Sequence, residues 1–306
     1  MVEEPVSRPR GPGKKQRFEV NGWLVLDKPV GMTSTQAVSR IKHLFKAKKV
    51  GHAGTLDPLA SGILPIALGE ATKTVPFVQD GRKSYRFRVR WGTQTDSDDS
   101  EGQAVATSAL RPSRESIVAA LPSFMGTLMQ RPPSYSAIKV AGERAYDRAR
   151  DGEVFELDAR SVTIHALDLL DVTPDEAVFE AECGKGTYVR AIARDLGAVL
   201  GCLGHVNALR RTRVGAFDEA QAVGLPEGDG EPPPLLGVEA GLQEVAEIPI
   251  HRNDAVRLRR GQPLILRGRD APSEGMAYAS CGGVVVAFGP IETGALQPYR
   301  VFNLPF

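Results

Sequence analysis

The chain has 306 residues, of which 42% are hydrophobic and 25% are charged, an ordinary globular composition with enough length for one large domain and a small one. The net charge is +1, so any affinity for a polyanion must come from the distribution of charge and not from its total. The three cysteines, Cys183, Cys202 and Cys281, are far apart without a C-x-x-C pair, which argues against a zinc cluster or a disulfide framework and favours reduced thiols in a cytoplasmic protein.

The first part of the chain predicts a polar arm, a strand and a helix. Residues 1–20 are rich in charge, proline and glycine, so we expect a disordered basic arm and neither a signal peptide nor a membrane anchor. Trp23–Leu26 predicts a short buried strand, followed by a turn at 29–31. Thr33 and Gln36 have the spacing of a capping box, which predicts that a helix begins there.

That helix is predicted to be amphipathic, with Val38, Ile41, Leu44 and Phe45 at helical spacing on its core side. Its basic residues belong to the first of three basic clusters: Arg40, Lys42, Lys46, Lys48 and Lys49; Arg82, Lys83, Arg86, Arg88 and Arg90; and Arg210, Arg211 and Arg213. The compensating acids are expected elsewhere, at Asp96–Glu101 and Glu227–Glu231. Each cluster is either a phosphate-binding surface or an ordinary solvated face.

The segment Gly51–Gly62, GHAGTLDPLASG, places a single carboxylate, Asp57, among small, turn-forming and apolar residues. Its glycines permit backbone angles and close approaches that a Cβ resists, and Pro58 fixes φ directly after the acid. Such a loop can hold one side chain in a defined pose. From this segment alone, Asp57 is either a turn residue that bonds to the backbone or a positioned catalytic acid.

The middle of the chain predicts strands and helices in a mixed order. Over Tyr85–Trp91 apolar residues alternate with arginines, which is the pattern of a half-buried strand. Thr187 is a candidate helix cap that places Arg190 in the first turn of a helix. The other expected strands are 162–170 and 177–183, and the expected helices are 114–121 and 188–200. This order favours an α+β fold with a mixed, largely antiparallel sheet.

The last part of the chain predicts a linker and a small β-rich unit. Residues 225–234, LPEGDGEPPP, have linker composition, so we place the linker at 225–237 and the small unit at 238–306. Within that unit we expect a turn at Gly282-Gly283, a strand at Val284–Phe288 and a closing segment at Pro298–Asn303.

Five segments of the sequence occur in the order found in one family. They are Leu26–Ser34, the Asp57 loop, Lys83–Arg86, Arg131–Lys139 and Gly184–Arg190. On these segments the chain resembles the bacterial tRNA pseudouridine-55 synthases, over about residues 21–213 and more weakly at the C-terminal end. The resemblance implies a pseudouridine synthase catalytic domain over 21–224, with an RNA-binding insertion at about 125–152. It also implies that residues 238–306 form a PUA-like RNA-binding domain.

The resemblance assigns chemistry to three residues. Asp57 matches the catalytic aspartate and is the expected nucleophile, Arg190 matches the arginine that pairs with it, and Tyr85 matches the tyrosine that stacks on the target base. A carboxylate in an apolar loop needs a cation or N–H donors nearby to remain charged, which is consistent with the pairing. From periodicity and position alone, Tyr85 is equally a core residue and Arg190 equally a surface arginine.

The resemblance also implies roles in binding. His52 is expected to contact the RNA near the vacated base position, and Tyr188 and Leu209 are expected to line the uridine pocket, although a turn residue and two core residues are the alternatives. Lys28 and Pro29 match a motif that supports the active-site loop. The expected RNA-binding residues of the insertion are Lys139, Arg144 and Arg148.

The implied reaction isomerises uridine 55 in the T loop of tRNA to pseudouridine after the base is flipped out of the stack. The N1–C1′ bond breaks, the base turns while bound, and C5 joins C1′, with no net redox change. No cofactor and no metal are expected, and the sequence has no P-loop and no H-E-x-x-H. Attack of Asp57 on C1′ and attack on C6 both remain open. The expected partner is the tRNA T stem-loop, with no membrane, no obligate protein partner and a monomeric enzyme.

Three other functions fit part of the sequence. A guide-dependent synthase acting on ribosomal RNA is less consistent with the insertion and the small C-terminal unit. An RNA-folding protein without catalysis is less consistent with the presence of Asp57, Tyr85 and Arg190 together. A glycoside hydrolase would require a second positioned carboxylate, and the sequence suggests no partner for Asp57.

Overall fold

The structure is a computed structural model that describes residues 16–136, 138–140, 143–144, 148, 153, 155, 157–226, 228, 230–266 and 274–306. The expected arm over 1–20 therefore lies mostly outside the described residues, as does much of the expected insertion. No helix among the described residues is long and apolar enough to cross a membrane. The described His, Cys, Asp and Glu side chains form no group that could hold a metal ion.

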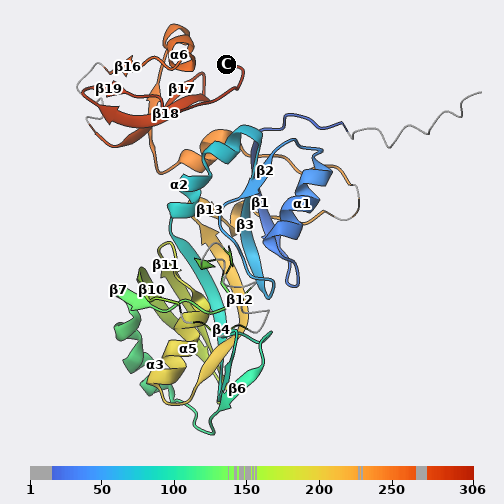
Figure 1. The fold of residues 1–306 in the computed structure, drawn as a ribbon, viewed down its shortest axis with the longest axis vertical. Helices are drawn as coiled ribbons and strands as arrows, with labels where there is room; N and C mark the ends of the chain where they lie inside the picture. The colour runs from blue at the N-terminus through green and yellow to red at the C-terminus, as the bar shows by residue number, and fades with distance from the viewer. Residues whose placement is uncertain are drawn as a thin grey trace, which may run out of the picture.

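A ten-stranded mixed sheet forms the body of the molecule (Figure 1). Its order is β14-β1-β3-β12-β4-β11-β10-β7, with β13 beside β12 and β2 beside β3. Only the β1–β14 and β3–β12 pairs are parallel, so the prediction of a mixed, largely antiparallel sheet is confirmed. The strands are β1 (Gly22–Lys28), β2 (Val50–His52), β3 (Ala60–Leu68), β4 (Lys83–Trp91), β7 (Gly126–Gln130), β10 (Arg160–Val172), β11 (Glu176–Cys183), β12 (Gly204–Val214), β13 (Phe217–Asp218) and β14 (Val223–Gly224).

The two halves of this sheet are buried differently. Strand β1 is buried on both faces: Leu24 and Leu26 join one hydrophobic core, whereas Trp23 and Val25 join a second. Strand β4 is buried on one face only, because Tyr85 and the apolar residues after it alternate with exposed arginines. A strand buried on both faces gives a continuous apolar run, and a half-buried strand gives an alternating one.

Helix α1 (Ser34–Leu44) begins as the sequence predicted. The Thr33 Oγ1 accepts from the Gln36 backbone N–H at 3.1 Å, and the Gln36 Oε1 accepts from the Thr33 N–H at 2.8 Å. The prediction for helix α5 (Val189–Val199) is only partly right. Its N-cap is Tyr188 and not Thr187, and no side chain of the cap residue bonds to the first turn. Arg190 nevertheless lies in the first turn, as expected.

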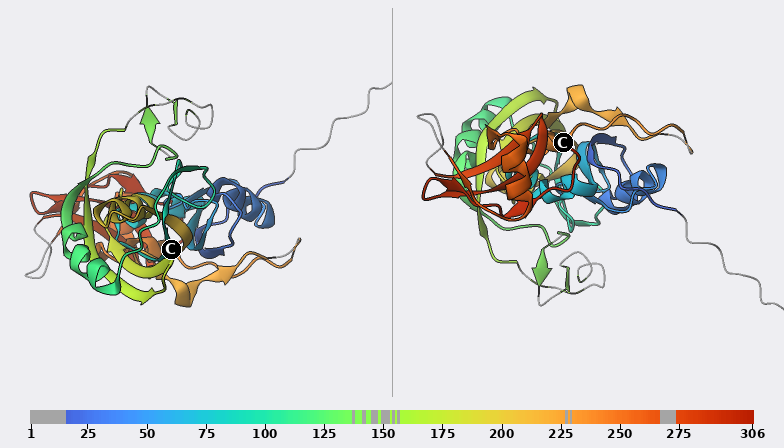
Figure 2. Two further views of the ribbon diagram at one scale, coloured as in Figure 1. Left: turned by 90° about the horizontal axis from the view of Figure 1, so that it is seen from below. Right: turned by 90° about the horizontal axis from the view of Figure 1, so that it is seen from above.

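Three further elements precede β10 in the chain. They are helix α2 (Val75–Asp80), helix α3 (Arg114–Ala120) and the hairpin of β5 (Thr93–Thr95) with β6 (Ala104–Thr107). Figure 2 shows a small hairpin standing away from the body of the molecule, where β8 (Lys139–Val140) pairs with β9 (Glu143–Arg144). This hairpin belongs to the expected insertion.

The C-terminal unit has its own sheet, in the order β15-β17-β18-β19-β16, with β20 beside β18. Its elements are β15 (Ala246–Pro249), α6 (Arg252–Arg259), β16 (Leu264–Ile265), β17 (Met276–Cys281), β18 (Val284–Glu292), β19 (Ala295–Leu296) and β20 (Arg300–Val301). The expected turn at Gly282-Gly283 joins β17 to β18.

The C-terminal unit packs against α2 and the segment Gly69–Lys73 that precedes α2. Phe288 meets Phe77 edge-on with ring centroids 4.9 Å apart, and the Lys73 ammonium donates to the Val301 carbonyl at 2.8 Å. The segment before the unit also returns to the sheet, because Leu236 and Trp23 exchange backbone hydrogen bonds of 2.8 and 2.9 Å. The second core therefore contains residues from both parts of the chain.

Candidate active site

The Asp57 loop joins β2 to β3 and is held from both sides by hydrogen bonds. The Ser34 hydroxyl donates to the Leu56 carbonyl at 3.0 Å and accepts from the Leu56 N–H at 2.8 Å. On the other side of the acid, the Pro58 carbonyl accepts from the Gly31 N–H at 2.8 Å. The residues before and after Asp57 are thus fixed to the segment that opens α1, so the carboxylate projects from a constrained backbone.

Arg211 lies buried beneath this loop. Its Nε donates to the Ile63 carbonyl at 2.8 Å, and its two Nη atoms donate to the carbonyls of Thr55 and Gly54, each at 3.1 Å. The sequence analysis placed Arg211 in a basic cluster and missed this role. The only sequence signal is its parallel partner Gly62, which leaves room for the close approach of β12 to β3.

Arg190 pairs with Asp57, as the resemblance implied. Its Nε lies 2.9 Å from Asp57 Oδ2, although the N–H is not aligned for a hydrogen bond. The Arg190 side chain is 4% exposed, whereas that of Asp57 is 32% exposed, so only the carboxylate faces solvent. The arrangement gives an accessible carboxylate held against a fixed cation.

A second carboxylate holds the same guanidinium. Asp99 Oδ2 lies 3.5 Å from Arg190 Nη1, and that nitrogen also donates to the Ser97 carbonyl at 2.9 Å. Asp99 is buried and accepts from the Ser97 hydroxyl at 2.6 Å. The acids of Asp96–Glu101 were expected away from the basic clusters, and no second carboxylate was expected beside Asp57. The structure instead brings Asp99 to the guanidinium that Asp57 contacts. In the sequence, Asp96–Glu101 is only a run of polar residues between two short strands. Nothing in that run indicates that it contacts α5 in the folded protein.

A pocket of about 240 Å³ opens beside the Asp57–Arg190 pair. The β5–β6 connection, Tyr135 and the Asp57 loop each contribute to its wall. Its lining residues are Asp57, Pro58, Asp96, Ser97, Asp99, Glu101, Gly102, Gln103, Tyr135 and Arg190. The pocket is thus lined by several carboxylates around one buried cation.

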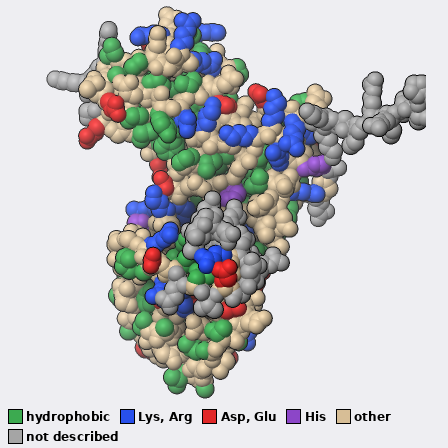
Figure 3. Space-filling model, in the orientation of Figure 1, with side chains coloured by type: hydrophobic (Ala, Val, Ile, Leu, Met, Phe, Trp, Pro, Cys, Tyr) green, Lys and Arg blue, Asp and Glu red, His purple; other side chains and the backbone are tan. Residues whose placement is uncertain are grey.

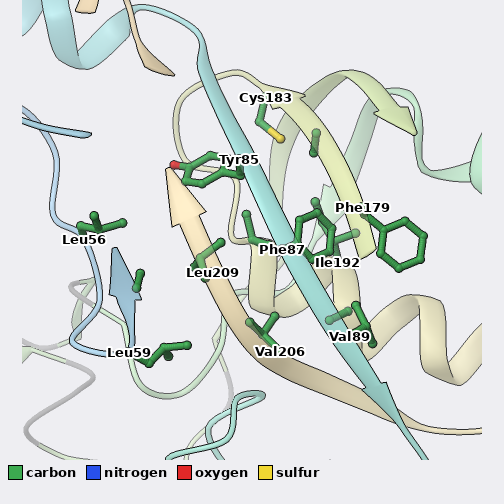
Figure 4. Close-up of a cluster of buried hydrophobic side chains, with 14 of the residues drawn as sticks. Leu56, Leu59, Tyr85, Phe87, Val89, Phe179, Cys183, Ile192, Val206 and Leu209 are labelled. Atoms are coloured by element: carbon green, nitrogen blue, oxygen red, sulfur yellow. The ribbon is translucent and has the colours of Figure 1, made fainter. Parts of the chain in front are cut away.

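Tyr85 lies in the core beside the loop and is 9% exposed. In Figure 4 its hydroxyl oxygen points away from Phe87 and toward the side where Leu56 and Leu59 of the loop lie. Burial raises the pKa of Tyr85, and the nearby Arg211 guanidinium partly opposes that rise. The phenol is therefore neutral at physiological pH. The structure brings Tyr85 to the loop and also makes it a core residue.

The three residues expected to contact the uridine or the RNA beside it are Leu209, Tyr188 and His52. Leu209 is buried in the same hydrophobic cluster as Tyr85. Tyr188 precedes α5, where its N–H donates to Gln130 Oε1 at 2.9 Å, and burial raises the pKa of its phenol. His52 ends β2 opposite Ile66, five residues before Asp57 in the chain.

Lys28 lies buried at the end of β1 and supports the turn before α1. Its ammonium donates to the carbonyls of Pro29 and Met32 at 2.8 and 2.7 Å. Burial lowers the pKa of Lys28 to about 8, and the charge of Asp57 opposes that shift. The structural role expected for Lys28 and Pro29 agrees with this geometry.

Most arginines of two of the three basic clusters pair with acids. Arg82, Arg86 and Arg88 pair with Glu182, Glu180 and Glu176 of β11 at 2.7, 3.4 and 3.6 Å. Arg210 makes a bidentate pair with Asp27, and Arg213 pairs with Glu182. These clusters are ordinary solvated or structural charges.

The first cluster, around the end of α1, differs from the other two because several of its lysines have no acidic partner among the described residues. Within the described part of the chain Lys42, Lys46 and Lys49 have no ion-pair partner. Figure 3 shows Lys and Arg side chains gathered over the part of the molecule where α1 lies. In the insertion, Arg148 pairs with Glu153 at 2.7 Å and lies over the Phe155 ring, while the side chains of Lys139 and Arg144 lie outside the described residues.

Residues 42–189 match the TruB family pseudouridylate synthase N-terminal domain, and residues 190–227 match the tRNA pseudouridylate synthase B C-terminal domain. The chain belongs to the TruB family of pseudouridylate synthases. Among curated TruB relatives, the tRNA pseudouridine synthase B of Nitrobacter winogradskyi is 57% identical over 304 residues, which cover 95% of this chain and 85% of that protein. The tRNA pseudouridine synthase B of Rhodopseudomonas palustris is 55% identical over 318 residues, covering 98% and 87%.

Solved structures share the fold of this TruB family chain. The structure of an H/ACA RNP bound to a substrate RNA containing 2'-deoxyuridine superposes with a TM-score of 0.71 and 22% identity, covering 93% of this chain and 85% of that chain. An archaeal box H/ACA sRNP Nop10-Cbf5 complex gives a TM-score of 0.68 at 22% identity, covering 92% and 85%. At such identities the likeness concerns the fold alone.

Proposed function

We propose that the chain is a tRNA pseudouridine synthase that converts uridine 55 of the T loop to pseudouridine, with Asp57 as nucleophile. The observation that carries this proposal is the accessible carboxylate of Asp57 held 2.9 Å from the buried Arg190 at the mouth of a pocket. The match to the TruB family and the name of its relatives, tRNA pseudouridine synthase B, support the choice of tRNA as substrate.

The proposed chemistry needs one nucleophile and no net oxidation. Attack by Asp57 on C1′ or on C6 of the uridine assists cleavage of the N1–C1′ bond and leaves the base free to turn within the site. C5 then bonds to C1′ and the carboxylate is released unchanged. The proton lost from C5 is balanced by the proton gained at N1, so the product is an isomer of the substrate. Arg190 fixes the direction of the Asp57 carboxylate.

Tyr85 is proposed to act on the base. Its ring is held in the core beside Leu56 and Leu209, so its face and hydroxyl group have a fixed position next to the Asp57 loop. An aromatic face at that position stacks on an unstacked base. Because burial raises its pKa, the phenol stays protonated and can donate a hydrogen bond to the base. Tyr188, Leu209 and His52 are proposed to complete the uridine pocket.

The RNA around the target base is proposed to bind through phosphates. The lysines at the end of α1, Lys42, Lys46 and Lys49, lack counter-charges among the described residues and precede the Asp57 loop in the chain. Lysines that contact phosphates make affinity fall as salt rises. The pocket is reached only by an extruded nucleotide, so binding of the flanking RNA must accompany base flipping.

The domain assignments are part of the same proposal. We assign residues 21–224 to the catalytic domain, with an RNA-binding insertion near 125–152, residues 225–237 to a linker and residues 238–306 to a PUA-like RNA-binding domain. The separate six-stranded sheet and α6 support the last assignment. The proposed enzyme is a monomer that acts on tRNA in the cytoplasm without a cofactor or an obligate protein partner.

The test is tritium release from tRNA carrying 5-³H-uridine, with the wild type and the Asp57→Asn variant. We expect release by the wild type, mapped to the T-loop uridine, and none by Asp57→Asn, because the amide keeps the shape and removes only the charge. The RNA affinity of the variant is expected to stay near that of the wild type. Asp80→Asn is the matched control, because Asp80 is an exposed acid paired with Lys185 at 3.0 Å. Tight tRNA binding by the wild type without release would support an RNA-folding protein instead.

A further inference from the structure

Residues 130–136, here called the strap, contribute Tyr135 to the wall of the pocket and are tied to α5 near both ends. Pro132 and Pro133 are buried in the strap and fix its φ angles, which makes this short segment stiff. Near its start, the Arg131 carbonyl accepts from Arg194 Nη2 at 2.8 Å. Near its end, the Tyr135 carbonyl accepts from Arg190 Nη2 at 2.7 Å. One helix therefore fixes both ends of a rigid segment.

The same two arginines also hold the acidic segment Asp96–Glu101 on the opposite side. Arg190 Nη1 donates to the Ser97 carbonyl at 2.9 Å, and Arg194 Nη1 pairs with Asp98 Oδ2 at 2.9 Å. Arg190 and Arg194 are four residues apart and so lie on one face of α5, one turn from each other. Each guanidinium thus joins the strap, α5 and the acidic segment, but only Arg190 touches Asp57.

Asp98 is retained in a costly environment. It is 5% exposed, and its φ of +60° lies in the left-handed region that residues with a Cβ rarely adopt. Burial also raises the pKa of Asp98 to about 6, which means that the charged form is disfavoured even beside Arg194. A strained backbone persists only where the surrounding structure holds it in place, and such positions cluster at functional sites. A buried ion pair such as Asp98–Arg194 is a weak source of stability, so stability alone does not explain it.

We propose that Asp98 and Arg194 are positioning residues that hold the strap and the acidic segment against α5 and thereby fix Arg190 in the direction of Asp57. The two carbonyls that receive Arg190 belong to Ser97 and Tyr135. Ser97 is the neighbour of Asp98, and Tyr135 lies at the far end of the strap that Arg194 anchors at Arg131. Releasing Arg194 lets both acceptors move, and Arg190 moves with them. This inference rests on the proposed function only for its activity readout.

The first test is the Arg194→Gln variant in single-turnover tritium release with saturating tRNA. We expect the rate to fall roughly 10- to 100-fold, the range that a small misplacement of reacting groups produces, while the tRNA dissociation constant changes by less than about threefold. Arg194→Lys is expected to recover most of the rate, because an ammonium can still pair with Asp98. Adding Asp98→Asn to Arg194→Gln is expected to cost no further rate, because the two residues act as one unit.

The matched control is Arg111→Gln. Arg111 pairs with Asp175 at 2.7 Å on the surface and takes no part in the pocket, so this variant is expected to keep the wild-type rate. A wild-type rate for Arg194→Gln, or additive losses for the two single changes, would overturn the proposal. If Arg194→Gln does not fold, Asp98→Asn decides the question, because it removes a buried charge and Asn tolerates the left-handed φ. A wild-type rate for folded Asp98→Asn would then overturn the proposal.

A second measurement does not depend on activity. Amide hydrogen exchange of the peptide covering 130–136 reports how firmly the strap is held. Faster exchange in Arg194→Gln than in Arg111→Gln and the wild type is expected, and equal exchange would contradict the proposed anchoring. A wild type without tritium release but with this exchange pattern would overturn the proposed function and leave the structural inference intact.

Discussion

The carbonyl oxygen of Arg211 lies where a side chain at Gly62 would have to begin: a Cβ built on Gly62 would be 2.2 Å from it. The two residues face each other across the parallel β3–β12 pair. Gly62 also has φ +101°, a left-handed conformation that disfavours any residue with a Cβ. The close approach lets the Arg211 guanidinium reach the carbonyls of the Asp57 loop from below.

Gly62→Ala is therefore expected to destabilise the fold by about 3 kcal/mol or more, because it adds backbone strain to a clash with main-chain atoms. The measurement is the free energy of unfolding from denaturant titration. Gly51→Ala is the control in the same segment: no heavy atom lies within 4 Å of its Cβ position and its φ is not left-handed. Equal stability of the two variants would mean that β12 and β3 separate easily at this point.

Asp99→Asn is expected to lower turnover about 10- to 100-fold with little change in RNA affinity, because it removes the second charge that fixes the Arg190 guanidinium. The measurement is single-turnover tritium release together with the dissociation constant for tRNA. Asp96→Asn is the control from the same segment, since Asp96 accepts from the Gln103 N–H and makes no contact with Arg190. Similar rates for both variants would leave Asp57 as the only acid that matters here.

Tyr85→Leu is expected to lose far more turnover than RNA affinity, because it removes the aromatic face and the hydroxyl group together. Tyr85→Phe separates the two roles, since the ring remains and only the hydroxyl is lost. The comparison is with Phe87→Leu. Phe87 is a core aromatic on the same strand as Tyr85, and its ring stacks on that of Phe179 with centroids 5.4 Å apart. That variant should lose stability and keep its turnover. Full activity of Tyr85→Leu would make Tyr85 a core residue only.

The contribution of Asp98 to the stability of the protein is expected to fall as pH rises from about 4 to about 6. Burial raises the pKa of Asp98 from 3.8 to about 6, so across this range the folded chain binds more protons at Asp98 than the unfolded chain does. A shift of this size corresponds to on the order of 3 kcal/mol. The charged groups that face Asp98 are Arg194, Arg190 and Asp195.

Asp98→Asn should flatten that part of the pH dependence, because the amide does not titrate. Melting temperatures measured between pH 4 and pH 7 provide the comparison. Asp175→Asn, at an exposed acid that pairs with Arg111, should keep the wild-type slope. If the melting temperature of Asp98→Asn changes with pH as that of the wild type does, then pairing with Arg194 offsets the effect of burial on the pKa of Asp98.

Local features of the fold were predictable from the sequence because their causes are local. The capping box of Thr33 and Gln36 depends on residues three apart, and the alternation along β4 depends on one half-buried strand. The prediction that Thr187 caps α5 failed for a non-local reason. The backbone N–H of Tyr188 is satisfied by Gln130, which lies at the end of β7 and is distant in the chain.

The main features of the site were not predictable from charge patterns. Arg211 and Arg213 look alike in the sequence and, two residues apart, would face the same side of a regular strand. A register shift against β4 falls between them, and the pairing of β12 with β3 places the Arg211 guanidinium under the Asp57 loop. Asp99 belongs to a run of acids that looks solvated. Its burial against Arg190 depends on the fold of β5 and β6 over α5, which no short pattern encodes.

The two-sided burial of β1 has a consequence for the order in which the molecule is completed during synthesis. Trp23 and Val25 belong to the same hydrophobic cluster as Phe288 and Phe302, so the core on one side of the first strand is completed only when some of the last residues are made. Its other face is covered earlier, by residues of α1, β4 and α5. While the ribosome is still extending the chain, β1 and β3 present a bare apolar surface. That surface is where a chaperone or an aggregating neighbour would meet the nascent protein.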